Sequence, residues 1–211
     1  DLLVSLPLQM FFIVTNNIEF DKSSKIKSKA LHLLTVHVNQ MHEVEQLRNL
    51  FEGNDIDNLF LKGSVTCTRY PKNEYRTMGD IDILYKVDQH KELKETLFAC
   101  GYGGYQEGRK NDTFRKPKHI MLEAHRQLVP SDSSFYDWCS KAWDRCVLCD
   151  GFSHAYQMTL EDEIIFNIIH FAIHFLEGGA GARFLCDVFV YKNQDCDLEY
   201  VDRELKKLDL F

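Results

Sequence analysis

Two short segments decide the fold: residues 59–64 read LFLKGS and residues 76–84 read RTMGDIDIL. The three apolar residues that open the first segment predict a short buried strand, which runs into a glycine-serine pair. Residues 81–87 predict a second strand. Because side chains alternate between the two faces of a strand, Asp80 and Asp82 are expected on one face, and the isoleucines after each of them enter the core.

The paired aspartates point to a bound cation. Two carboxylates held this close repel each other and are costly unless a cation lies between them. Hard oxygen ligands of this kind suit Mg²⁺, which keeps several waters and takes its other ligands from substrate phosphates. An Asp-x-Asp pair is also common on a solvated strand face, so further residues are needed to make the case.

A third acid comes from a later segment. Residues 119–128 predict another strand, on which Glu123 and His125 share one face. If the strands are neighbours, three carboxylates could hold two ions roughly 4 Å apart, an arrangement that stabilises the attacking and leaving oxygens of an in-line phosphoryl displacement. His125 could orient Glu123 or contact a nucleotide, or its role could be structural.

The glycine-serine pair supplies a place for phosphate. Gly63 lets the backbone approach a phosphate closely, and Ser64 can offer its hydroxyl and amide at the start of a helical turn. Lys62 and Arg76 are available to offset the charge of a triphosphate, and Arg76 is nearest to the acids in sequence.

Composition narrows the class of protein. The 211 residues fit one compact domain, or a small domain with an appended lobe, and the formal charge of −7 argues against an extended nucleic-acid footprint. The seven scattered cysteines are typical of reduced cytosolic thiols, and the Cys146-x-x-Cys149 pair completes no standard zinc pattern. Residues 2–14 are apolar but too short to span a bilayer, and we read them as a buried helix or packing arm. A cytoplasmic location without membrane contact is therefore expected.

The pattern along the chain predicts three parts. Helical spacing of apolar residues over 25–51 indicates an N-terminal helical arm at 1–56. An α/β core occupies 57–129, in which the polar segment 103–118 forms a loop or a loose hairpin. Residues 130–211 are expected to form a C-terminal helical lobe, where Thr159-x-x-Asp162 is a capping box that opens an apolar helix.

The order of these motifs resembles the polymerase-beta-like nucleotidyltransferase superfamily. More narrowly, LKGS at 61–64, Tyr70-Pro71, R-x-MGDID at 76–82 and LEAH at 122–125 resemble a family of bacterial uncharacterised nucleotidyltransferases. The resemblance is strong over about 58–129 and weaker beyond. It implies an α+β fold, with a palm-like mixed sheet packed by helices and flanked by the helical arm and lobe. It also implies Mg²⁺ or Mn²⁺ and transfer of a nucleoside monophosphate from a nucleoside triphosphate (NTP) with release of pyrophosphate.

The resemblance also assigns roles to residues. Gly63 and Ser64 would hold the triphosphate, Asp80 and Asp82 would bind both metal ions, and Glu123 would bind the second ion and help to activate the acceptor hydroxyl. One departure is the spacer of fifteen residues between Ser64 and Asp80, which is slightly longer than usual and makes the placement of Arg76 uncertain.

Several alternatives stay open from the sequence. The acceptor could be a small molecule, a protein or an RNA end. The chain could instead be a catalytically weak nucleotide-binding regulatory or toxin–antitoxin module, or a structural protein whose acids are surface charge. His170 and His174 are either core histidines or, with Arg183, line the cleft; Asp187 is expected to pair with Arg183.

Overall fold

The computed structural model describes residues 24–117, 120–178, 181, 183–192 and 194–210. The predicted packing arm at 2–14 lies outside the described residues.

A seven-stranded mixed sheet with the order β3-β4-β5-β2-β1-β7-β6 forms the centre of the molecule. The strands β2 and β5 pair in parallel, as do β1 and β7, and the other neighbours are antiparallel. This architecture confirms the predicted α+β class. The strands are β1 (Asn58–Leu61), β2 (Ile81–Tyr85), β3 (Gly103–Glu107), β4 (Asn111–Lys116), β5 (Ile120–His125), β6 (Val147–Leu148) and β7 (Ala155–Gln157).

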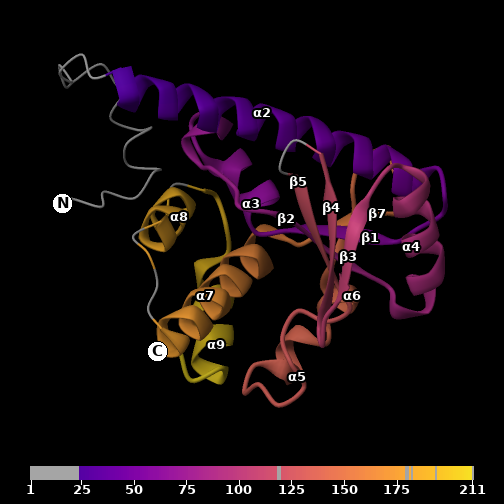
Figure 1. Ribbon diagram of the computed structural model, residues 1–211. Coiled ribbons are helices and arrows are strands. Elements are labelled where there is room, and N and C mark those ends of the chain that lie inside the picture. The colour runs from indigo at the N-terminus through magenta and orange to yellow at the C-terminus, as the bar shows by residue number, and fades with distance from the viewer. Residues whose placement is uncertain (1–23, 118–119, 179–180, 182, 193, 211) are drawn as a thin grey trace.

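Helices cover both faces of the sheet, so β1 and β2 are buried at every position. The long helix α2 (Ser24–Glu52) and α4 (His90–Ala99) pack on one face, against alternating residues such as Phe60, Ile81 and Ile83. The other face packs against α7 (Leu160–Glu177), α9 (Leu198–Lys207) and their neighbours. Figure 1 shows α2 running along the opposite side of the sheet from α7 and α9. The remaining helical elements are α3 (Gly63–Thr66), α5 (Tyr136–Cys139), α6 (Ala142–Arg145), α8 (Arg183–Tyr191), and the single 3₁₀ turns Cys67–Arg69, Asn73–Tyr75 and Val87–Gln89.

Local signals set several boundaries. The side chain of Thr159 accepts a hydrogen bond from the amide of Asp162 at 3.2 Å, as a capping residue does, and α7 begins one residue later. The polar segment at 103–118 contains the antiparallel β3–β4 hairpin, one of the two forms expected. The strands β6 and β7 were not expected, because the region after residue 130 was predicted to be helical. The division of the chain into arm, core and lobe stays a prediction.

A buried ion pair connects the loop before β2 to α8. The guanidinium of Arg76 donates from Nε to Asp187 Oδ1 at 3.2 Å and from Nη2 to Oδ2 at 3.0 Å, and the Tyr70 hydroxyl donates to Oδ1 at 2.7 Å. Arg76 is 5% exposed and Asp187 is 2% exposed, so water does not screen the pair. The prediction that Asp187 pairs with Arg183 was therefore wrong. Asp187 is bound instead by two donors of the Arg76 guanidinium, whose fork matches the planar carboxylate.

A second polar cluster joins α3 to the C-terminal helices. The Tyr191 hydroxyl donates to Glu163 and contacts the Thr66 hydroxyl at 3.1 Å, while Asn167 donates to the Tyr191 oxygen at 3.0 Å. Glu163 also accepts two hydrogen bonds from the guanidinium of Arg69. Both clusters hold the segment that carries Gly63 and Ser64 against the helices α7 and α8.

The buried Arg76–Asp187 pair gives a stability prediction. Replacing Asp187 by alanine leaves a buried guanidinium without its counter-charge, so we expect the free energy of unfolding to fall by about 3–5 kcal/mol. Urea unfolding measures the change. The matched control is Asp202→Ala, which removes the exposed carboxylate paired with Lys206 and should change stability by less than about 1 kcal/mol. Equal effects of the two variants would contradict the buried pair.

Candidate active site

Asp82 and Glu123 lie on the face of the sheet that packs against α7. In the parallel pairing of β2 and β5, Asp82 lies beside Glu123, and Leu84 lies beside His125. Ligand atoms of Asp82, Glu123 and His125 all lie within 4.8 Å of one another. Strand pairing therefore brings together residues that are more than forty positions apart in the sequence.

Asp80 completes the acidic group from just outside the strand. It was predicted to lie on β2, but β2 begins at Ile81, so Asp80 sits in the preceding bend and is half-buried. Burial, followed by the charges of Asp82 and Glu123, raises the pKa of Asp80 to about 6. Burial and the charge of Asp82 also raise the pKa of Glu123. Burial is the larger cause of both shifts, and repulsion between the neighbouring carboxylates adds to it.

Asp82 differs because two neighbours compensate its charge. Lys62 Nζ donates to Asp82 Oδ1 at 2.6 Å, and His125 Nε2 lies 2.7 Å from the same oxygen. Burial alone would raise the pKa of Asp82, but the Lys62 ammonium and the His125 ring hold it below its usual value. Lys62 reaches this position with φ 50° and ψ −122°, a conformation that costs a non-glycine residue of order 1–3 kcal/mol. Lys62, predicted to contact phosphate, here binds a carboxylate.

His125 is held between two acids. Burial lowers its pKa despite the attraction of Asp82, so the ring is neutral near pH 7 and donates from Nε2 to Asp82. The same nitrogen lies 3.5 Å from Glu123 Oε2. The other ring nitrogen, Nδ1, is buried without a hydrogen-bond partner among the residues described. The ring thus positions Asp82 and connects it to Glu123.

The glycine-serine turn lies next to these acids in the fold, but its details differ from expectation. The Ser64 hydroxyl was expected to face phosphate; it is buried and donates to the Leu61 carbonyl at 2.8 Å. A Cβ on Gly63 would lie 2.6 Å from Nη1 of Arg76 and 2.8 Å from Cγ of Met78. Glycine is therefore required because two side chains pack directly against its Cα.

Arg76 does not occupy the position predicted for it. We expected it to contact a triphosphate, but its guanidinium is buried behind Gly63 and engaged by Asp187. The sequence could not show this, because Asp187 lies more than a hundred residues further along the chain.

The helices α7 and α8 contribute two further residues, His170 and Arg183, whose roles the sequence left open. Burial, followed by the charge of Lys62, lowers the pKa of His170 to about 3, and Asp82 acts on it in the opposite direction. Burial and then the charge of Arg76 lower the pKa of Arg183, while Asp187 and Asp80 raise it. Within the described part of the chain, Arg183 forms no hydrogen bond or ion pair. Both side chains thus lie within electrostatic reach of the acids.

The rings on α7 and α8 form an aromatic group beside these residues. The His170 and His174 ring centroids are 4.3 Å apart, and Phe184 lies 5.5 Å from His170 and 5.8 Å from His174. Among the described residues, the cluster of Asp82, Glu123 and His125 is the one group suited to a metal ion, and it does not include the α7 histidines. The structure therefore favours aromatic packing for His170 and His174 over zinc ligation.

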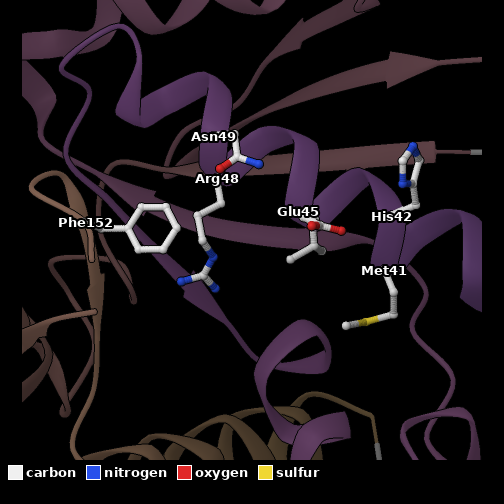
Figure 2. A pocket seen from close by; sticks show the side chains of 7 residues that line it. Met41, His42, Glu45, Arg48, Asn49 and Phe152 are labelled. Carbon is white, nitrogen blue, oxygen red and sulfur yellow. The ribbon is translucent and has the colours of Figure 1, made fainter. Parts of the chain in front are cut away.

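A separate cavity of 510 Å³ lies along α2, away from the acids. Figure 2 shows the Arg48 side chain extended beside the ring of Phe152, with Glu45, His42 and Met41 further along α2. The Arg48 guanidinium lies 5.1 Å from the Phe60 ring and 5.6 Å from the Phe152 ring, and it donates to the Cys149 sulfur at 3.2 Å. Cys149 is thus used in packing, and it is not paired with Cys146 in a disulfide.

In the described ranges, no helix has the length and apolar character required to cross a bilayer.

Solved structures of other proteins resemble the fold of this chain. The chain is similar in fold to a crystal structure of ANT(2″)-Ia in complex with adenylyl-2″-tobramycin, with a TM-score of 0.60 and 11% identity over 81% of this chain and 97% of that one. It is also similar to the solution structure of the antibiotic-resistance factor ANT(2″)-Ia, with a TM-score of 0.58 and 10% identity over 82% and 90% of the two chains. At such identities the likeness shows the fold alone. No curated protein sequence matches the chain.

The family comparison agrees with the motifs. A family model described as an uncharacterised nucleotidyltransferase matches residues 23–211, which is most of the chain. The predicted resemblance is thereby confirmed: the chain belongs to this family of uncharacterised nucleotidyltransferases.

Proposed function

We propose that this protein transfers a nucleoside monophosphate from a Mg²⁺-bound NTP to an acceptor hydroxyl and releases pyrophosphate. The observation that carries the proposal is the pairing of Asp82 with Glu123 on adjacent strands, with Asp80 one residue before the first strand. Lys62 pairs with Asp82, but three carboxylates gathered this closely still repel one another, and a bound cation would offset that cost.

The donor set fits Mg²⁺ or Mn²⁺. Asp80, Asp82 and Glu123 offer hard carboxylate oxygens, and repulsion among them contributes, after burial, to the raised pKa values of Asp80 and Glu123. Such an ion, when bound, polarises the phosphoryl oxygens and offsets charge on the leaving pyrophosphate.

Glu123 is the group placed to take up a proton. Its side chain is 26% exposed, against 3% for Asp82, so an acceptor can approach it. In the proposed step, the acceptor oxygen forms a bond to the α-phosphorus while the bond from that phosphorus to the bridging oxygen breaks. Pyrophosphate leaves, and the acceptor proton passes to the Glu123 carboxylate. His125 holds Asp82 in place during this step through its hydrogen bond.

Arg183 is the cation that we assign to the triphosphate, in place of Arg76. Its guanidinium is half-buried, forms no hydrogen bond or ion pair in the described ranges, and is affected by the charge of Asp80. We assign the backbone groups at Gly63 and Ser64 to the same phosphate site. The acceptor is proposed to be a small molecule, as the adenylyl-tobramycin complex of the similar ANT(2″)-Ia fold illustrates for that protein.

Two contacts favour a second candidate, a nucleotide-binding module with slow turnover. The Ser64 hydroxyl donates to the Leu61 carbonyl, and the Lys62 ammonium holds a carboxylate needed by the metal. Both contacts must rearrange before the site is competent, and binding requires less of this rearrangement than catalysis.

The metal site gives the first test of the proposal. The double variant Asp82→Asn plus Glu123→Gln should lower the rate of labelled nucleotide transfer or pyrophosphate release by more than about 100-fold, beyond what the loss of residues that merely orient metal ligands costs. Mg²⁺ with NTP should raise the melting temperature of the parent but not of the variant. Asp88→Asn, at an exposed position outside the site, is the control. Full activity in the double variant would overturn the proposal, and Mg²⁺-dependent binding without product would favour the slow module.

The Arg183 assignment has a separate kinetic test. Arg183→Met should raise the KM for NTP about tenfold or more, because a charged hydrogen bond to phosphate of about 1.5–3 kcal/mol is lost. Arg203→Met, which removes an exposed guanidinium on α9, should leave the KM unchanged. An unchanged KM in both variants would show that Arg183 does not contact the triphosphate.

The raised pKa of Asp80 predicts a pH-dependent stability in metal-free protein. An aspartate titrates near about 3.9 in an unfolded chain, whereas folding raises the pKa of Asp80 to about 6. Between these values the folded state binds more protons than the unfolded state, so the contribution of Asp80 to stability falls as the pH rises. In EDTA, Asp80→Asn should therefore match the parent near about pH 4 and exceed it near about pH 7. Urea midpoints measured across this range test the expectation, and a pH-independent difference would contradict it.

A further inference from the structure

A cavity of 660 Å³ opens between the residues that lead into β4, the turn at 130–135, and the second half of α7. Its wall includes Lys110 and Asn111 on one side and Ile173 on the other, with Ser134 in the turn between them. The volume is in the range of small-molecule sites, roughly 300–1,000 Å³.

The cavity continues the acidic site along the same sheet face. Asn111 lies directly opposite His125 in the antiparallel pairing of β4 and β5, so the two side chains share a face. On the helix, Ile173 comes three positions after His170 and therefore lies on the same side of α7. His170 faces the acids, since the charges of both Lys62 and Asp82 reach it. The cavity therefore opens on the sheet face that carries Glu123, the proposed proton acceptor.

The cavity wall carries two cations, Arg109 and Lys110, and one acid, Asp132, in a protein that is acidic overall. Lys110 forms no hydrogen bond or ion pair through its side chain with any described residue, and its charge reaches Glu123 and His125. Arg109 pairs with Asp132 at 3.4 Å, but both side chains are more than 70% exposed, so this pair is weak and can open. The chain has a net charge of −7, and two cations at one cavity are therefore a local departure.

We infer that this cavity binds the acceptor, and that the acceptor is a small hydroxyl compound carrying a phosphate or carboxylate group, which Lys110 binds. The inference rests on the proposed nucleotidyl transfer and names its acceptor class. An anionic group beside Lys110 would hold a hydroxyl of the same molecule toward Glu123, while the apolar Ile173 contacts its carbon skeleton. A polycationic acceptor would meet the same two cations unfavourably.

The first experiment measures binding without requiring turnover. Glucose 6-phosphate, gluconate and uncharged glucose are titrated into isotope-labelled protein, and amide chemical shifts are followed by NMR. The two anions should shift the amides of Asn111 and Ser134, glucose should not, and Lys110→Met should weaken the anion effect about tenfold or more. The matched control is Lys91→Met, since Lys91 is an exposed lysine on α4. The glucose 6-phosphate and gluconate arms separate phosphate from carboxylate recognition.

Three results of this titration would overturn the inference. The first is no shift at the cavity with either anion, and the second is a shift that Lys110→Met leaves intact. The third is a shift confined to the amides of Gly63 and Arg183, which would place the anion in the proposed triphosphate site instead.

The second experiment separates this inference from the proposed function. Pyrophosphate release from Mg²⁺–NTP is measured with glycerol 3-phosphate, glucose 6-phosphate, gluconate, their uncharged parents and an aminoglycoside. Anionic acceptors should give the higher kcat/KM, and Lys110→Met should remove this preference while leaving the KM for NTP unchanged. Equal pyrophosphate release with charged and uncharged acceptors would overturn the proposed acceptor class but would still support the enzymatic function. An anion bound at Lys110 with no pyrophosphate released from any acceptor would keep the site and reject the enzymatic function.

Discussion

The parallel pairing of β2 and β5 imposes the constraint to which the rest of the site responds. In that register Asp82 and Glu123 are neighbours on adjacent strands, and Asp80 adds a third carboxylate just before β2 begins. Neighbouring residues offset part of the negative charge of these carboxylates. The Lys62 ammonium and the His125 ring act on Asp82, while Asp80 and Glu123 have raised pKa values instead. Carboxylates with such perturbed pKa values, gathered in one place, are typical of functional sites.

A second constraint fixes the glycine-serine turn against the C-terminal helices. Arg76 stands behind Gly63 and is bound by Asp187 of α8, and Thr66 contacts Tyr191 of the same helix. Polar contacts at this depth are directional, so they define one relative position of the turn and helix where apolar packing alone would tolerate several. These contacts thereby join segments that are more than a hundred residues apart in the sequence.

How much of this could be predicted depends on the range of each interaction. The faces of Asp82, Glu123 and His125 follow from a period of two on short strands, and the family motif supplied their proximity. The partner of Arg76 could not be predicted, because nothing near it in sequence indicates Asp187. The hydrogen bond from the Ser64 hydroxyl to the Leu61 carbonyl depends on the folded turn, so the sequence could not predict it. Lys110 could not be singled out either, because its segment has the polar composition of a solvated loop. The short strands β6 and β7 carry no clear alternation, with both residues of β6 exposed, so composition alone gave a helical lobe.

Those two strands have a consequence for the integrity of the molecule. Since β7 pairs with β1, and the Asn58 amide donates to the His154 carbonyl at 2.9 Å, residues near 155 complete the sheet on the side away from β2. A fragment ending at residue 129 would expose the backbone of β1 as an open edge, where unpaired amides and carbonyls invite pairing with other chains. We therefore expect the first 129 residues, separated from β6 and β7, to aggregate more readily than the whole chain.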